Sequence, residues 1–122
     1  MEVIKFRAYD ELVRRMYEDV QTGVYEDPDG ILDFGTIIGL YRFKIIQYVG
    51  IKDNSGIEAY EKDIIQLKNG QRWIIEELTH KGLLMKWCKK PSEFFLFSEL
   101  NTEKGFDIIG NVFENENLLK QP

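Results

Sequence analysis

The stretch that most constrains the fold is Gln47–Leu67, which reads QYVGIKDNSGIEAYEKDIIQL. It begins within a hydrophobic run, Phe43–Ile51, which ends in the polar cluster Lys52–Gly56. Glycine adopts positive φ without steric cost, and Asp, Asn and Ser side chains bond their own backbone, so this cluster predicts a turn. The chain then passes a short polar segment, Tyr60–Asp63, and enters a second β-branched run, Ile64–Leu67. This order predicts a strand, a loop, a tight corner and another strand.

Two hairpins are predicted downstream of this stretch. The turn Lys68–Gln71 contains Asn-Gly, which is the strongest short-range hairpin signal when apolar runs flank it. A second hairpin joins the strand Arg72–Leu78 to its partner Leu83–Cys88 through the turn Thr79–Gly82. Pro91 ends the partner strand, because proline has no N–H to donate to a ladder.

The C-terminal part of the chain predicts two more strands and one helical turn. The strands are Glu93–Leu100 and Phe106–Phe113, which a turn at Asn101–Gly105 separates. Residues Glu114–Leu119 are expected to form the helical turn.

The N-terminal part predicts a strand over Val3–Tyr9, because apolar and polar residues alternate there and Tyr9 falls on the polar face. Residues 12–20 allow two interpretations. Their apolar spacing tolerates a helix, but a turn at Asp10-Glu11 would let Val13–Tyr17 fold back on the first strand as a hairpin. We prefer the hairpin.

An acidic string, Glu26–Gly30, follows. The spacing of Asp27, Asp29 and Asp33 faintly resembles a calcium loop, but the twelve-residue pattern with its closing glutamate is absent. The Pro-Asp-Gly sequence within the string is a standard turn, and the turn is our interpretation.

The segment Thr36–Ile51 is strongly apolar and is interrupted by Gly39. One long bent strand or two short ones would satisfy this pattern, with the glycine at a bend or bulge. No internal repeat or linker is visible, and a chain of this length predicts one domain over residues 1–122. The fold class we predict is all-β, mainly antiparallel, in the form of a small and strongly bent barrel. The corner at Tyr60–Asp63 and the hairpin Arg72–Cys88 suggest an SH3-like core, extended by N- and C-terminal strands.

Composition limits the classes of function. The formal net charge of −5 disfavours nonspecific binding to nucleic acid or to anionic membranes. A single cysteine, Cys88, cannot form an internal disulfide, which fits a reducing cytoplasm. The first residues lack a signal-peptide pattern, and no apolar run approaches the roughly 18 residues that span a bilayer. We therefore expect a cytoplasmic protein with no membrane partner.

The inventory of catalytic side chains is poor, and we expect no enzymatic activity. The only histidine is His80, in a predicted turn, and the serines Ser55, Ser92 and Ser98 lie in no recognisable nucleophile elbow. One histidine and one cysteine cannot build a closed zinc site without carboxylates. We expect Cys88 to be a small buried hydrophobe, and we predict no catalytic residue, cofactor or metal ligand.

Four carboxylates gather in the central stretch, namely Asp53, Glu58, Glu61 and Asp63. Two carboxylates across a cleft would suit glycoside hydrolysis, but acids in turns are usually solvated. We expect Asp63 instead to accept backbone N–H groups that fix the corner before the next strand.

Aromatic residues are the main candidates for a binding surface. Trp73 and Trp87, together with the phenylalanines near residues 94–97, could form a stacking groove for single-stranded nucleic acid or for a peptide. Basic residues accompany the tryptophans at Arg72 and in Lys86–Lys90. The alternative is that these rings fill the core of a small barrel, and we prefer it, because most large apolar residues must be buried.

Three segments stand out: Ile4–Asp10, Gln47–Gly56 continuing into Tyr60–Ile65, and Asp107–Asn115 closing with Leu118-Leu119. In their order and spacing they resemble the YopX-type family of small phage and prophage proteins. The family usually has glycine where Lys62 stands, which suggests a strain of roughly 1 to 2 kcal/mol if this lysine adopts positive φ. It commonly has proline where Glu116 stands.

The resemblance implies an origin among the accessory genes of bacterial viruses, and it brings neither an activity nor a functional residue. Our first expectation is a non-enzymatic module that binds a phage or host protein in the cytoplasm of a bacterial host cell, with a homo-oligomer as a further option. The alternative is a protein that binds single-stranded nucleic acid through Trp73, Trp87 and Lys86–Lys90.

Overall fold

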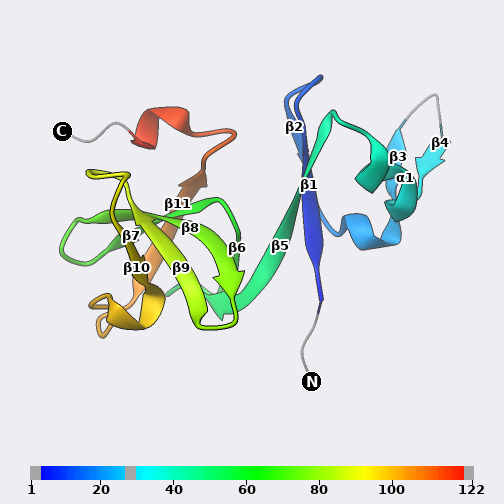
Figure 1. Cartoon of the computed structure of the whole chain (residues 1–122). Coiled ribbons are helices and arrows are strands. Elements are labelled where there is room, and N and C mark those ends of the chain that lie inside the picture. Colours follow the sequence, from blue (N-terminus) through cyan, green and yellow to red (C-terminus); the bar gives the residue numbers. More distant parts are fainter. Residues whose placement is uncertain (1–3, 27–29, 120–122) are drawn as a thin grey trace. The chain divides into compact units, whose positions relative to one another are not determined.

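Antiparallel β-structure makes up nearly all the regular structure of this computed structural model, which describes residues 4–26 and 30–119 (Figure 1). Within those ranges α1 is the one α-helix, so the all-β prediction is confirmed. The strands and helices, with 3₁₀ turns as η, are β1 (Phe6–Asp10), β2 (Arg15–Tyr17), η1 (Val20–Thr22), β3 (Val24–Glu26), β4 (Gly30–Leu32), α1 (Phe34–Gly39), β5 (Phe43–Lys52), β6 (Glu58–Tyr60), β7 (Asp63–Leu67), β8 (Arg72–Thr79), β9 (Gly82–Trp87), β10 (Phe94–Leu96), η2 (Phe97–Glu99), β11 (Phe106–Asn111) and η3 (Glu116–Leu119).

Backbone contacts divide the chain into two units, Met1–Tyr48 and Val49–Pro122. The boundary falls inside β5, which is hydrogen-bonded to β1 and to β6. These contacts do not decide whether the chain is one domain, so the single-domain prediction stays a prediction. Measuring whether the chain unfolds in one transition tests it.

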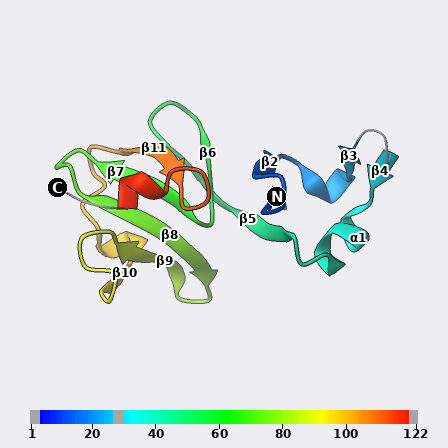
Figure 2. The same cartoon turned by 90° about the horizontal axis from the view of Figure 1, so that it is seen from above.

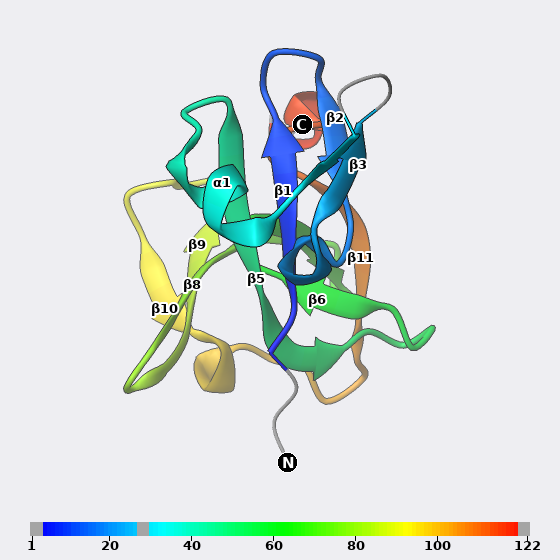
Figure 3. The ribbon, with the colours of Figure 1, turned by 90° about the vertical axis from the view of Figure 1, so that its right-hand side faces the viewer.

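In the first unit, β1 lies between β2 and β5 and pairs antiparallel with both (Figure 3). Ala8 faces Tyr17 across the β1–β2 pair, so the hairpin interpretation of residues 12–20 is confirmed. Tyr9, expected on the polar face, is buried. Ala8, Val20, Ile37 and Phe43 form the buried core of this unit.

The prediction of a strand from residue 36 is wrong for Thr36–Gly39, which belongs to helix α1. The physical reason is a helix cap: the carboxylate of Asp33 accepts the N–H of Thr36 at 2.7 Å, and Ile37 is fully buried. Gly39 ends the helix and does not bend a strand. Asp33 thus has a capping role, while the predicted turn and calcium-loop residues Asp27 and Asp29 lie outside the described residues.

The second unit is built on a five-stranded antiparallel sheet in the order β10-β9-β8-β7-β11. The corner before β7 and the β8–β9 hairpin, on which the SH3-like core was predicted, are both present, and the strands curl strongly (Figures 1 and 2). One side of the sheet buries a cluster that includes Ile65, Trp73 and Met85. The other buries Ile64, Ile74 and Cys88 beneath the C-terminal turn η3, which the sequence also predicts.

Candidate functional site

The corner Tyr60–Asp63 is fixed by its own side chains, as the sequence predicts. Asp63 is almost completely buried, and its carboxylate accepts the N–H of Tyr60 at 2.9 Å. Lys62 adopts a φ of 70°, and its carbonyl accepts the N–H of Val112 at 3.0 Å. Its ammonium lies 3.0 Å from a carboxylate oxygen of Glu76. These contacts hold the backbone, so the corner is a structural element.

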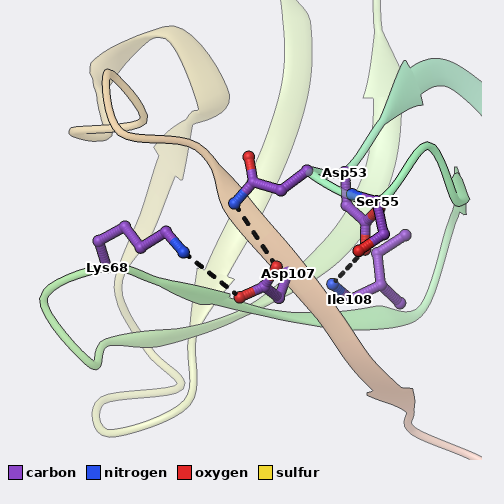
Figure 4. Close-up of polar contacts among 6 residues, drawn as sticks. Asp53, Ser55, Lys68, Asp107 and Ile108 are labelled. Carbon is purple, nitrogen blue, oxygen red and sulfur yellow. Dashed lines mark hydrogen bonds and ion pairs between the residues drawn. The ribbon is translucent and has the colours of Figure 1, made fainter.

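Asp53 has the same kind of role in the loop after β5 (Figure 4). Its carboxylate accepts the N–H groups of Ser55 at 2.8 Å, Ile57 at 2.9 Å and Ile108 at 3.0 Å. Burial acts to raise the pKa of Asp53, but the N–H groups of Ile108, Ile57 and Ser55 together lower it below its ordinary value. All three donors favour the ionised form, so this carboxylate is a poor general acid.

The adjoining contacts of this loop also reach β11 (Figure 4). Asn54 donates its side-chain amide to Asp107 at 3.5 Å, and the Lys68 ammonium lies 3.9 Å from the other oxygen of Asp107. Gly105, at a φ of 85°, lies so close to the Asn54 side chain that a Cβ there would collide with it. The family-like segments around residues 53 and 107 therefore bind each other and hold the fold.

The remaining catalytic candidates are not brought together in the structure. His80 is exposed at the β8–β9 turn. Cys88 is a free, buried thiol, and burial raises its pKa against smaller opposing effects of Arg72 and Lys86. No cluster of three His, Cys, Asp or Glu side chains within residues 4–26 and 30–119 could hold a metal ion. In the same ranges no helix has the length and apolar character needed to cross a membrane.

The tryptophans meet on the curved sheet. Trp73 and Trp87 face each other across β8 and β9, with ring centroids 5.7 Å apart and planes only 13° from parallel. Phe95, on β10, packs its ring against Trp73 at 5.6 Å and 86°. Trp73 is 4% exposed and belongs to the core, whereas Phe95 is 39% exposed. The preferred core interpretation is therefore correct for Trp73.

The outer side of this aromatic cluster lines a pocket of about 200 Å³, here called the aromatic pocket. Trp73, Trp87 and Phe95 form its ring-bearing wall. The rest of the lining comes from the β7–β8 turn and from the end of η2 with the residues that follow it: Gln71, Glu99, Leu100 and Asn101. The aromatic cluster thus has one side in the core and one side in a pocket. The four carboxylates of the central stretch line neither of the two pockets described.

The basic stripe that the sequence suggests does not line the aromatic pocket. Side chains alternate between the faces of a strand, so Lys86 and Trp87 point to opposite faces of β9. Arg72 donates to the carbonyl of Leu118 in the C-terminal turn. The aromatic pocket has a carboxylate, Glu99, and no Lys or Arg in its lining.

A second pocket of about 180 Å³, here called the lysine pocket, is lined by Lys68, Asn69, Asn101 and Lys104. It shares Asn101 with the aromatic pocket. The sequence predicts the turns that carry these residues, the first of them from its Asn-Gly pair, but no local pattern indicates that the two turns meet.

Comparisons with known proteins agree with the fold. A crystal structure of protein EF1440 from Enterococcus faecalis superimposes with a TM-score of 0.66, at 22% identity, over 98% of this chain and 100% of that chain. At this identity the likeness concerns the fold alone. No curated protein matches the sequence. The model of the family described as YopX protein matches residues 5–120, which span both units. The resemblance inferred from the three segments is confirmed, and the chain belongs to the YopX family.

Proposed function

We propose that this chain is a non-enzymatic protein-interaction module of bacterial viruses and prophages, which binds a phage or host protein through the aromatic pocket. The observation that carries the proposal is a pocket of about 200 Å³ with an aromatic wall and a few polar groups at its rim. Pockets of this composition are typical of binding sites, and aromatic residues are enriched where proteins meet. Phe95 is the most exposed of the three rings in the wall, so it is the first contact for a partner.

Binding without catalysis is supported by how the polar groups of this unit are used. The buried carboxylates of Asp53 and Asp63 accept backbone N–H groups, and the thiol of Cys88 is buried on the other side of the sheet from the aromatic cluster. Of the candidate catalytic residues, none lines the aromatic pocket.

Origin in a phage or prophage and action in the cytoplasm of a bacterial host are part of the proposal. Membership of the YopX family supports the origin. The single, buried thiol of Cys88 suits a reducing compartment.

The test compares two neighbouring phenylalanines of β10. Phe94 and Phe95 are both exposed, at 48% and 39%, but only Phe95 lines the aromatic pocket. Affinity capture from a host lysate should retain a partner on the wild-type chain and on Phe94→Ala, and lose it on Phe95→Ala. The captured protein is then purified, and light scattering of the reconstituted complex gives its stoichiometry. Circular dichroism and a thermal melt establish that Phe95→Ala is folded.

The proposal fails if the wild-type chain remains a monomer without a partner, or if Phe95→Ala retains the partner as well as Phe94→Ala does. Binding of single-stranded nucleic acid remains the alternative proposal. It predicts quenching of tryptophan fluorescence by an oligonucleotide, weakened by salt.

A further inference from the structure

The aromatic pocket and the lysine pocket are neighbours on one surface of the second unit. Asn101 lines both of them. The β7–β8 turn contributes to both as well, with Asn69 in one and Gln71 in the other, and the N–H of Gln71 donates to the Asn69 side chain at 2.9 Å. A short extended segment of a ligand could therefore occupy both pockets at once.

The two pockets differ in chemistry. The aromatic pocket offers rings and the apolar side chain of Leu100, which suit an aromatic or aliphatic group. The lysine pocket carries two ammonium groups and two amides, which suit an anion. Asp107 lies 3.9 Å from Lys68, at the limit of an ion pair, and Lys104 has no ion pair with any residue that the structure describes. Positive charge at this end is thus only partly neutralised.

The arrangement favours a peptide over a nucleic acid. A single-stranded nucleic acid needs basic groups along its backbone and open ring faces for its bases. Here the basic groups lie at one end, and Glu99 would repel phosphates at the aromatic end. Trp73 is covered by two other rings and is 4% exposed. The net charge of −5 adds long-range repulsion of a polyanion.

We infer that the two pockets together bind an extended peptide segment in which an aromatic or aliphatic side chain neighbours an Asp or Glu. The apolar side chain fills the aromatic pocket against Trp87 and Phe95, and the carboxylate pairs with Lys68 and Lys104. This inference rests on the proposed function and names the chemistry of the partner.

The experiment uses the indole N–H signals of Trp73 and Trp87, the two tryptophans of the chain, as reporters in ¹H–¹⁵N correlation spectra. The probes are capped peptides of sequence Gly-Ser-Phe-Asp-Gly-Ser and its Asp-Phe permutation, with analogues that carry Asn for Asp or Gly for Phe, and a thymidine hexanucleotide. We expect an acidic peptide to shift the indole signals. The Asn analogue should bind up to about fivefold more weakly, as for the loss of an exposed charge pair. The Gly analogue should bind at least about tenfold more weakly, as for the loss of a buried apolar anchor.

Charge at the lysine pocket is tested with Lys68→Gln/Lys104→Gln, against Lys89→Gln/Lys90→Gln as a matched control. Lys89 and Lys90 are exposed lysines that line neither pocket. The first double variant should bind the acidic peptide more weakly by a factor similar to that of the Asn analogue, and the control should bind like wild type. Indole shifts caused by the hexanucleotide alone, equal binding of the Asn analogue, equal effects of the two double variants, or no shift with either acidic peptide would overturn the inference.

Failure of this inference can be separated from failure of the proposed function. If Lys68→Gln/Lys104→Gln still captures the lysate partner and Phe95→Ala does not, the proposed interaction module stands and the inference of an acidic peptide fails. If Phe95→Ala still captures the partner, both the proposed function and the peptide inference fail.

Discussion

The carboxylate of Asp53 accepts the backbone N–H of Ile108 at 3.0 Å, across a sequence separation of 55 residues. Two further N–H groups, those of Ser55 and Ile57, reach the same carboxylate. One side chain therefore organises a loop and connects it to a distant strand. A buried donor that loses its acceptor costs roughly 1 to 3 kcal/mol, so we expect the loss of this carboxylate to destabilise the fold by at least that amount.

The stability of the fold should depend on pH through the carboxylate of Asp53. The folded-state pKa of Asp53 is lowered, so its stabilising contribution is fully present above the unfolded pKa of about 4 and is lost as pH falls through the folded pKa. We expect the free energy of unfolding to decline more steeply below about pH 4 in the wild type than in Asp53→Asn. Urea melts at several pH values measure both slopes. Equal slopes would show that this carboxylate is not the coupled group.

Asp63→Ala should damage folding and leave partner binding intact in the molecules that remain folded. The substitution removes the acceptor of the buried Tyr60 N–H, at a cost of roughly 1 to 3 kcal/mol. Denaturant melts measure the loss of stability, and peptide titration measures binding. If the variant had wild-type stability and had lost its partner, the structural role assigned to Asp63 would be wrong.

Lys62→Gly tests the strain at the corner. Lys62 has a φ of 70°, which glycine adopts without the penalty that a Cβ brings, about 1 to 2 kcal/mol. Both Lys62→Gly and Lys62→Ala remove the ion pair with Glu76, so the difference between them isolates the backbone. We expect Lys62→Gly to be more stable than Lys62→Ala by roughly 1 kcal/mol in chemical denaturation. The reverse order would argue against strain.

Gly105→Ala should destabilise the second unit by roughly 1 to 2 kcal/mol from backbone strain at its φ of 85°, with an additional cost from the collision with Asn54. Combining it with Asn54→Gly relieves the collision and leaves the strain. A double-mutant cycle by thermal or urea unfolding should therefore give a favourable coupling between the two sites. Strict additivity would mean that the loop moves aside at no cost.

Unfolding of the whole chain should be a single cooperative transition, because β5 is hydrogen-bonded to β1 and to β6. Hydrogen exchange of amides in β1 reports on the first unit, and tryptophan fluorescence reports on the second. We expect both probes to give the same midpoint and the same free energy of unfolding. Two separate midpoints would mean two domains and would contradict the single-domain prediction.

Most strands and turns of the second unit were predictable because their signals are local. The exceptions are β6 (Glu58–Tyr60), which was not predicted as a strand, and the predicted strand Glu93–Leu100, which is β10 followed by the 3₁₀ turn η2 (Phe97–Glu99). The Asn-Gly pair after β7 and the alternation in β8 specify a turn and a strand from adjacent residues. Helix α1 was missed because Ile37 and Ile38 belong to a β-branched run, although the capping side chain of Asp33 preceded it.

The candidate site was only partly predictable. The sequence singles out Trp73 and Trp87 but not their setting, because the pocket depends on the pairing of β8, β9 and β10. Strand register decides which side chains share a face of the sheet. Lys86 is adjacent to Trp87 in the sequence and therefore points to the opposite face. The lysine pocket joins residues from turns that are more than thirty positions apart, such as Lys68 and Lys104, and no local pattern connects them.

The boundary between the two units lies within β5, between Tyr48 and Val49, where no linker separates them. A chain divided at that point would cut β5, which continues from its pairing with β1 (Phe43–Gln47) to the unit that contains its other neighbour, β6. We therefore expect the two units to depend on one continuous strand, so that they cannot be exchanged separately by a crossover at their contact boundary. A chimera should keep its fold only if its crossover lies in a turn and β5 is transferred whole.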